Sequence, residues 1–213
     1  MAPAEAPSVG TVRVIVVVEG TNDIEFLRRI SLILRTTDSA LPSLPEMEQQ
    51  GELIFLPFGG GSVAAFTHRL APLGRPEFHL YDHELPPETE YRRQAAEQVN
   101  RRPGCHAVLT RKRSLENYLH PHAIHAAGDI PVEFDDFDSV ADVVAKRIYQ
   151  RGLDDTPWEQ LAPRSRKRQA NRAKRWLNTR VAERMTSALL DEQDSQGEIP
   201  SWLQTIGRLA KRP

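Results

Sequence analysis

Five acidic residues of this chain follow three short apolar stretches at close range. The stretches are rich in Val, Leu, Ile or aromatic residues and cover residues 12–18, 78–81 and 106–110. The five acids are Glu19, Asp23, Asp82, Glu84 and Glu116. If the three stretches are parallel strands of one sheet, their carboxyl ends meet at the edge where such sheets bind ligands. We therefore expect the five side chains to lie close together.

Carboxylates that meet at one edge repel one another, which raises their pKa values unless a cation neutralises them. Oxygen ligands of this kind select Mg²⁺ or Mn²⁺, with water completing each coordination shell. Five carboxylates are enough for one or two such ions. Two ions about 4 Å apart would activate a water molecule and stabilise the leaving oxygen of a phosphodiester. The pattern therefore predicts a metal-dependent enzyme that acts on phosphates.

The spacing within the acidic pairs suggests how the side chains would reach one crevice. Glu19 lies at the tip of its strand, and Asp23 lies near the start of the next helix. Asp82 and Glu84 are two residues apart, so they would point to the same side of an extended chain. Glu116 comes from a neighbouring strand–helix unit.

Apolar stretches alternate with segments of helical spacing up to about residue 128. Short, nearly continuous apolar runs are typical of strands buried on both faces of a parallel sheet. The predicted strands cover residues 12–18, 53–58, 78–82 and 106–110. The predicted helices cover residues 22–35, 62–73 and 88–100, and another begins at Ser114. This rhythm predicts an α/β fold, a Rossmann-like parallel sheet flanked by helices.

The composition shifts after about residue 128, and no further convincing strand appears. Helical spacing predicts helices over residues 139–150 and 165–190, and a short last helix that holds Trp202, Ile206 and Leu209. We therefore expect three segments: a flexible tail, an α/β catalytic domain and a helical C-terminal extension. Their ranges are residues 1–10, 11–128 and 129–213.

A basic segment lies inside this extension, with seven Lys or Arg residues among residues 164–175. Such a segment could hold the phosphate backbone of a nucleic acid, or it could be a solvated helix face. We favour phosphate contact because the acidic cluster already calls for a phosphate substrate. The residues expected to bind nucleic acid are Arg164, Arg166, Lys167, Arg168, Arg172 and Arg175.

A glycine-rich turn, residues 59–61, precedes Ser62, which can cap a helix. The backbone N–H groups of this turn could cradle a phosphate. Alternatively, the glycines only permit positive φ angles in a tight turn. The sequence leaves both interpretations open.

Four short blocks, VEGTND, GGGS, LYDHE and SLENYL, resemble the motifs of a Toprim domain, the metal-binding module of topoisomerases, primases and certain nucleases. The last block is similar in particular to the nucleases of the OLD (overcoming lysogenisation defect) family and their stand-alone relatives. The resemblance covers about residues 12–125. It implies a Toprim-like fold and an Mg²⁺- or Mn²⁺-dependent endonuclease.

The resemblance also assigns roles to residues. It implies that Glu19 binds metal or transfers protons, and that Asp23, Asp82, Glu84 and Glu116 bind metal. It further implies a catalytic lysine in the helical part, for which Lys174 has the best position. The family's usual second Asp of the third block is Glu84 here, and its extra methylene could shift one metal by about a bond length.

OLD proteins usually carry an ABC-type ATPase on the same chain. This sequence has no G-x-x-x-x-G-K-[ST] motif, so the resemblance implies a separate ATPase partner, as in a two-component phage-defence nuclease. Two other functions stay open: a non-catalytic Toprim module that binds nucleic acid or serves as a scaffold, and a small ribonuclease that processes structured RNA. The sequence does not choose between DNA and RNA, and it leaves a homo-oligomer open.

Composition sets broader limits. The formal net charge is −1, so only local charge can indicate a nucleic-acid partner. The single cysteine, Cys105, excludes an internal disulfide and a zinc cluster built on cysteines. We expect a cytoplasmic protein with no membrane partner, because the first residues lack the features of a signal peptide and the longest apolar run is too short to span a bilayer.

Overall fold

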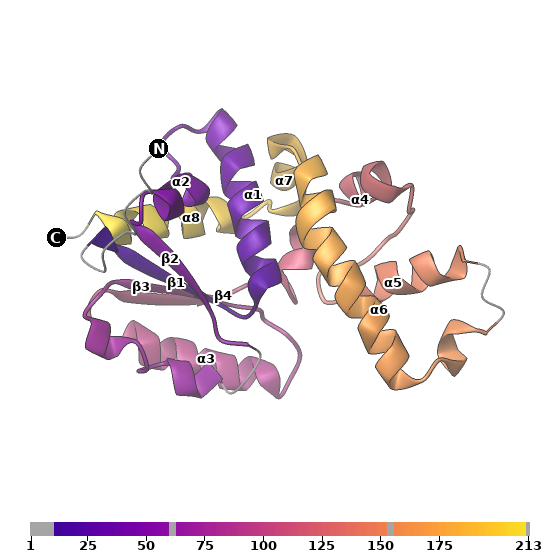
Figure 1. Ribbon diagram of the computed structural model, residues 1–213, viewed down its shortest axis with the longest axis horizontal. Helices are drawn as coiled ribbons and strands as arrows, with labels where there is room; N and C mark the ends of the chain where they lie inside the picture. Colours follow the sequence, from indigo (N-terminus) through magenta and orange to yellow (C-terminus); the bar gives the residue numbers. More distant parts are fainter. Residues whose placement is uncertain (1–10, 60–62, 153–155, 212–213) are drawn as a thin grey trace, which may run out of the picture.

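The computed structural model describes residues 11–59, 63–152 and 156–211. Within these residues, four parallel strands form one sheet in the order β2-β1-β3-β4 (Figure 1). The strands are β1 (Val14–Val18), β2 (Leu53–Pro57), β3 (Glu77–Tyr81) and β4 (Cys105–Leu109). The predicted α/β fold with a parallel sheet is therefore confirmed, and each strand lies within two residues of its predicted bounds.

The two central strands, β1 and β3, are buried along their whole length. Alternate side chains of β1 enter two different apolar clusters, because successive residues of a strand point to opposite faces. Val16 packs with helices α1 (Thr21–Thr37) and α8 (Glu198–Ala210), whereas Val17 packs with α3 (Glu88–Asn100). Figure 1 shows α3 on one side of the sheet and α1 and α8 on the other.

The strand order reverses direction between β1 and β3, because the chain adds β2 on one side of β1 and then crosses to add β3 and β4 on the other. Open α/β sheets bind ligands at this kind of switch point, outside the carboxyl ends of the strands. Glu19 and Asp82 directly follow the two strands that flank the switch point. The topology therefore delivers these two acids to the same crevice.

The predicted helix over residues 62–73 is wrong. The described part of this range holds two short 3₁₀ helices, η2 (Val63–Phe66) and η3 (Ala71–Leu73). Pro72 lacks a backbone N–H, and Gly74 has a φ of 60°, so the chain turns out of the helix there. Gly60, Gly61 and Ser62 lie outside the described residues, as do residues 1–10.

The predicted continuous helix over residues 165–190 is also wrong. It is divided into α6 (Pro163–Trp176), a π-helical turn η6 (Leu177–Val181), a 3₁₀ turn η7 (Ala182–Arg184) and α7 (Ser187–Gln193). Thr186 caps α7 by accepting a hydrogen bond from the backbone N–H of Leu189 at 3.2 Å. The π turn packs against α1 and α4 and buries Leu177 and Asn178.

The remaining elements are α2 (Leu44–Gln49), η4 (Leu115–Tyr118), α4 (Pro121–Gly128), α5 (Val140–Gln150) and η5 (Trp158–Gln160). The predicted helices over 88–100 and 139–150 are confirmed as α3 and α5. Figure 1 shows α5 and α6 projecting beyond the end of the sheet. One apolar cluster contains residues from β1, α1, α6 and α8, so the C-terminal helices and the sheet share a core. No helix among the described residues is long and apolar enough to cross a membrane.

Candidate metal centre

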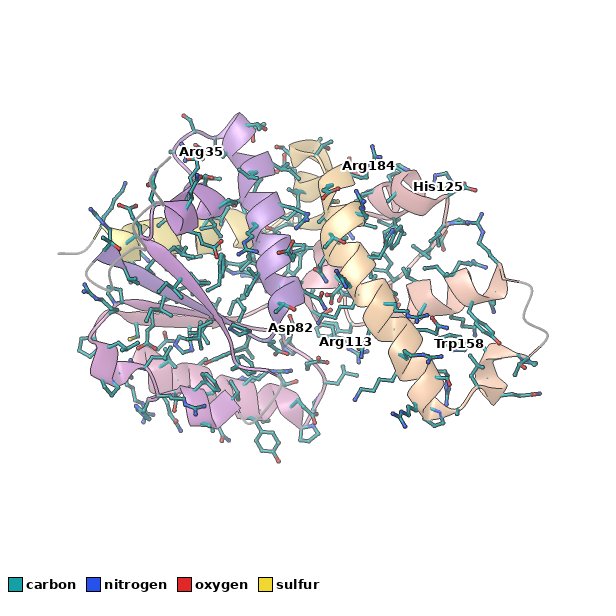
Figure 2. The ribbon with its side chains drawn as sticks, in the orientation of Figure 1. Arg35, Asp82, Arg113, His125, Trp158 and Arg184 are labelled. Atoms are coloured by element: carbon teal, nitrogen blue, oxygen red, sulfur yellow. The ribbon has the colours of Figure 1, made fainter. Side chains whose placement is uncertain are left out.

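Three carboxylates meet at the carboxyl ends of β1 and β3. Glu19, Asp82 and Glu84 each offer an oxygen atom, and these atoms lie within 4.8 Å of one another. Figure 2 labels Asp82 and Arg113 in the region between the sheet and α6. A divalent cation needs several oxygen ligands at short distances, and this cluster provides three from two strand ends.

Glu84 belongs to the cluster as predicted, but the backbone conformation that places it there differs from the extended chain that we expected. Its φ is 55°, in the left-handed region, so the chain is not extended after Asp82 and the alternation argument does not apply. The backbone N–H of Glu84 donates to the carbonyl of Arg113 at 2.9 Å, and the Arg113 Nε atom lies 3.5 Å from Glu84 Oε2. These contacts fix the turn that carries Glu84.

Asp23 and Glu116 lie at the same site but are not among the three residues of the cluster. Asp23 Oδ2 accepts a hydrogen bond from the backbone N–H of Gly20 at 2.8 Å at the start of α1. Burial is the main cause that raises the pKa of Asp23; Lys174 lowers it, and the charge of Glu116 raises it further. Glu116 is buried in η4.

Lys174 lies between two of the acids. Its Nζ atom is 3.6 Å from Glu116 Oε1 and 3.8 Å from Asp82 Oδ2. The charge of Glu116, more than any other group, raises the pKa of Lys174 above its usual range, so this lysine is positively charged at neutral pH. The structure thus brings together all five predicted acids and the predicted lysine, from β1, α1, β3, η4 and α6.

Asp82 is buried, with 2% of its surface exposed. Its Oδ1 atom accepts a hydrogen bond from the backbone N–H of Leu115 at 3.2 Å. Its Oδ2 atom is buried and has no hydrogen-bond partner among the described residues. Burial raises the pKa of Asp82 well above its ordinary value, although Lys174 acts in the opposite direction.

Burial also raises the pKa of two neighbouring acids. The pKa of Glu19 rises to about 7, with Arg92 lowering it and Asp23 raising it further. The pKa of Asp23 rises to about 6 in spite of Lys174. Buried carboxylates that bind protons so readily lack enough positive charge around them. Together with the unbonded Oδ2 of Asp82, this deficit fits a site built for a divalent cation.

Arg92 is a site residue that the sequence did not reveal. Its Nη2 atom forms an ion pair with Glu19 Oε1 at 2.6 Å, and its Nη1 atom lies 4.0 Å from Glu84 Oε1. The only available signal was its place near the start of α3, the helix that follows the acidic block after β3. Arg92 holds Glu19 towards the cluster and supplies part of the missing positive charge.

Asn178 is a second such residue. It is fully buried in the π turn, and its Nδ2 group donates to Glu116 Oε1 and to the carbonyl of Lys174. Its spacing of four residues from Lys174 is the signal that places both on one helix face. Asn178 therefore orients Glu116 beside the lysine.

The basic residues of α6 lie next to these acids. Arg166 and Lys167 line a cavity of about 610 Å³ together with Glu84, Glu116 and Lys174. A second hollow, about 570 Å³, lies along α6 and is lined by Arg164, Lys167, Arg168, Arg172 and Arg175. Among the described residues, none of the six predicted nucleic-acid-binding residues forms an ion pair with an acid. Their positive charge is thus available to an anion.

No protein-family model and no curated protein sequence matches this chain. The chain is similar to a solved structure, the C-terminal region of the Xanthomonas campestris pv. campestris OLD protein, with a TM-score of 0.52 at 12% identity. The match covers 93% of this chain and 96% of that chain. This chain has the fold of that region.

Two further structures of the same OLD region give TM-scores of 0.48 and 0.49, each at 16% identity. They cover 95% and 93% of this chain and 95% and 96% of their own chains. The structure with a TM-score of 0.52 covers 93% of this chain and supports the fold as a whole. The Toprim assignment stays a prediction from the four sequence blocks.

Proposed function

We propose that this chain is a nuclease that hydrolyses phosphodiester bonds in DNA or RNA with the help of Mg²⁺ or Mn²⁺. The observation that carries the proposal is the buried Oδ2 atom of Asp82, which has no hydrogen-bond partner among the described residues and lies in an acidic cluster beside the basic helix α6. A metal site and a phosphate-binding surface in contact are what phosphodiester hydrolysis requires.

The cluster of Glu19, Asp82 and Glu84 would hold a first ion. Asp23 and Glu116 are further ligands if two ions bind. A bound divalent cation would lower the pKa of a ligated water and offset the charge of the phosphate. The family's Asp is Glu84 here, and its ion pair with Arg113 would have to loosen for Glu84 to bind metal fully.

Two residues would act on the reacting groups, and a third would position one of them. Glu19 would either bind the ion or, in its place, accept a proton at a carboxylate oxygen from the attacking water. Lys174 can stabilise the negative charge that grows on the phosphate in the transition state. Arg92 positions Glu19 through their ion pair.

Outside the centre, the cations of α6 would hold the nucleic-acid backbone on either side of the scissile bond. We propose in addition that a separate ABC-type ATPase works with this chain, on the basis of the motif resemblance. The substrate and the ATPase can be tested independently.

The decisive experiment is a cleavage assay with Mg²⁺ and with Mn²⁺ on single-stranded DNA, double-stranded DNA and structured RNA, with and without the ATPase. EDTA is the chemical control. Lys174→Ala should slow cleavage at least tenfold without changing metal affinity, and Lys146→Ala, an exposed lysine on α5, is the matched control. If no substrate is cut under any condition, a non-catalytic binding module becomes the better description.

The basic face has its own test. Replacing three cations of α6 by Ala should weaken nucleic-acid binding and reduce the slope of log affinity against log salt by about two to three. The variant is Arg166→Ala, Lys167→Ala and Arg168→Ala. The control removes the same charge from exposed sites elsewhere: Arg101→Ala, Arg184→Ala and Lys211→Ala. An unchanged slope in the α6 variant would indicate that this segment is a solvated helix face and does not contact phosphate.

A further inference from the structure

The cavity of about 610 Å³ between α5, α6 and residues 113–116 is lined by residues of different chemical character. Its cations are Arg113, Arg166, Lys167 and Lys174. Its apolar residues are Val140, Ala141, Ala170 and Trp158. Figure 2 labels Arg113 and Trp158, two of the lining residues. A ligand that contacts both the cations and the apolar residues must have an anionic part and a flat or apolar part.

The cavity opens directly onto the proposed metal centre, because Glu84, Glu116 and Lys174 line it as well. Its volume lies within the range of roughly 300–1,000 Å³ that is typical of small-molecule pockets. One base with its sugar is a ligand of this size class, whereas a paired base must first leave the duplex stack to enter such a cavity. A phosphate attached to that sugar would meet the acidic cluster.

Phe137 adds an exposed aromatic ring beside this cavity. The side chain is 45% exposed, and its ring packs edge-on against His83 with the centroids 5.3 Å apart. The carbonyl oxygen of Phe137 accepts a hydrogen bond from Arg113 Nη1 at 3.3 Å, and Arg113 lines the cavity. Phe137 therefore lies next to Arg113, a residue of the cavity lining.

The loop that carries Phe137 is fastened to the site. The Nδ2 group of Asn117 donates to the carbonyls of Asp135 and Asp138 at 3.0 and 3.1 Å. The backbone N–H of Arg113 donates to the carbonyl of Asp136 at 2.8 Å. An aromatic ring that is exposed on an anchored loop is pre-organised to stack on a ligand.

Resting on the proposed nuclease function, we propose that this cavity seats one unpaired nucleotide of the substrate and that Phe137 stacks on its base. The substrate class is then single-stranded nucleic acid, or a duplex with an unpaired nucleotide next to the scissile bond. Cations of the cavity hold the adjoining phosphates, and the apolar residues of the lining contact the base. Fully paired duplex binds only through the outer cations of α6.

The test is equilibrium binding by fluorescence anisotropy, in EDTA so that no strand is cut. The probes are a fully paired duplex, the same duplex with one bulged nucleotide, and the single strand, each as DNA and as RNA. We expect the bulged and single-stranded probes to bind about tenfold more tightly than the paired duplex, and Phe137→Ala to remove most of that difference. Phe137→Trp should retain it, which excludes a loss caused by misfolding.

Leu73→Ala is the matched control, since Leu73 is a 53% exposed apolar residue just before the start of β3, at the sheet edge opposite the site. Its affinities should match those of the wild type. Equal wild-type affinity for paired and bulged probes would overturn the proposal, as would an equal loss for both probes in Phe137→Ala. If the protein cleaves nucleic acid but shows no preference for unpaired probes, the nuclease function stands and the nucleotide-binding role of the cavity is wrong. If it prefers unpaired probes but cleaves none of them, the binding role stands and the nuclease function is wrong.

Discussion

A buried carboxylate lies at each end of strand β3, and the two carboxylates differ in how many of their oxygens have a partner. At the start of the strand, Glu77 is fully buried and has partners for both oxygens: Arg102 forms an ion pair with it, and His79 Nε2 lies 2.8 Å from Oε2. Just past the other end, Asp82 is equally buried, but its Oδ2 atom has no hydrogen-bond partner among the described residues. Equal burial thus has different consequences.

The pKa values reflect the difference. Burial acts to raise the pKa of Glu77, but hydrogen bonds from His79 and Arg102 outweigh it and hold the pKa below its ordinary value. At Asp82 burial prevails over Lys174, and the pKa is raised. A buried acid whose charge the protein neutralises completely stabilises the fold. A buried acid with too little positive charge around it is a candidate for binding a cation.

The largest expected effect comes from Asp82→Asn. The variant keeps an oxygen for the Leu115 N–H but loses a metal-binding charge, so the rate of cleavage should fall by about a thousandfold or more. Its free energy of unfolding in EDTA should not decrease, because a repelled buried charge is removed. A cleavage assay and urea unfolding measure the two effects. Asp191→Asn, an exposed acid on α7, is the control, and loss of folding in the Asp82 variant would contradict the comparison.

The reverse pattern is expected for Glu77→Ala. Removing this acid leaves His79 and Arg102 without their buried partner, which should cost about 3–5 kcal/mol of unfolding free energy. Urea unfolding measures it, with Glu97→Ala on the exposed face of α3 as the control. Stabilisation by Mg²⁺ should persist in the folded fraction, since Glu77 lies at the far end of β3. A loss below 1 kcal/mol would show that Glu77 is not a structural anchor.

The third effect is on ligand-linked stability. At about a hundred times its dissociation constant, Mg²⁺ should stabilise the wild type by about 2.7 kcal/mol. The same concentration should leave Asp82→Asn nearly unchanged, and it should stabilise Asp191→Asn like the wild type. Thermal unfolding with a Mg²⁺ titration measures the shift. Equal shifts in all three proteins would mean that the ion binds elsewhere.

The smallest expected effect is a dependence on pH. The pKa of Glu19 in the folded protein, about 7, is above its ordinary value of 4.5. Its contribution to stability is therefore full below about pH 4.5 and is lost as the pH rises to about 7. Glu19→Gln should consequently gain on the order of 2 kcal/mol over the wild type between pH 4.5 and pH 8 in EDTA. A constant difference in urea unfolding would contradict the raised pKa.

Much of this arrangement could be predicted from residue types and spacing. A buried strand such as residues 14–18 leaves a clear apolar run, and an acid such as Glu19 directly after it is placed by the sheet topology. The positions of Asp82 and Glu116 follow in the same way. Strand ends are local features of the sequence, so they can be recognised without a structure.

Other parts depend on contacts between distant segments, and the sequence did not indicate them. Arg92 and Asn178 reach the acids only because α3 and the π turn are packed in particular orientations. Glu77 lies just before the predicted strand 78–82, and its partner Arg102 lies 25 residues away in the sequence. The helix over residues 165–190 was predicted as continuous because its apolar spacing carries on through the π turn, where tertiary packing changes the hydrogen-bond pattern.

The shared core of the sheet and the C-terminal helices has a consequence for synthesis of the chain. A nascent chain that ends after β4 contains Glu19, Asp23, Asp82 and Glu84, but the ribosome has not yet made Lys174 or Asn178. The first half can therefore assemble acids that repel one another without the cation that balances them. Since α8 also packs against β1 and β3, the sheet gains its full cover only when residues 198–210 emerge. The proposed nuclease would therefore stay inactive during synthesis at least until residues 198–210 have emerged.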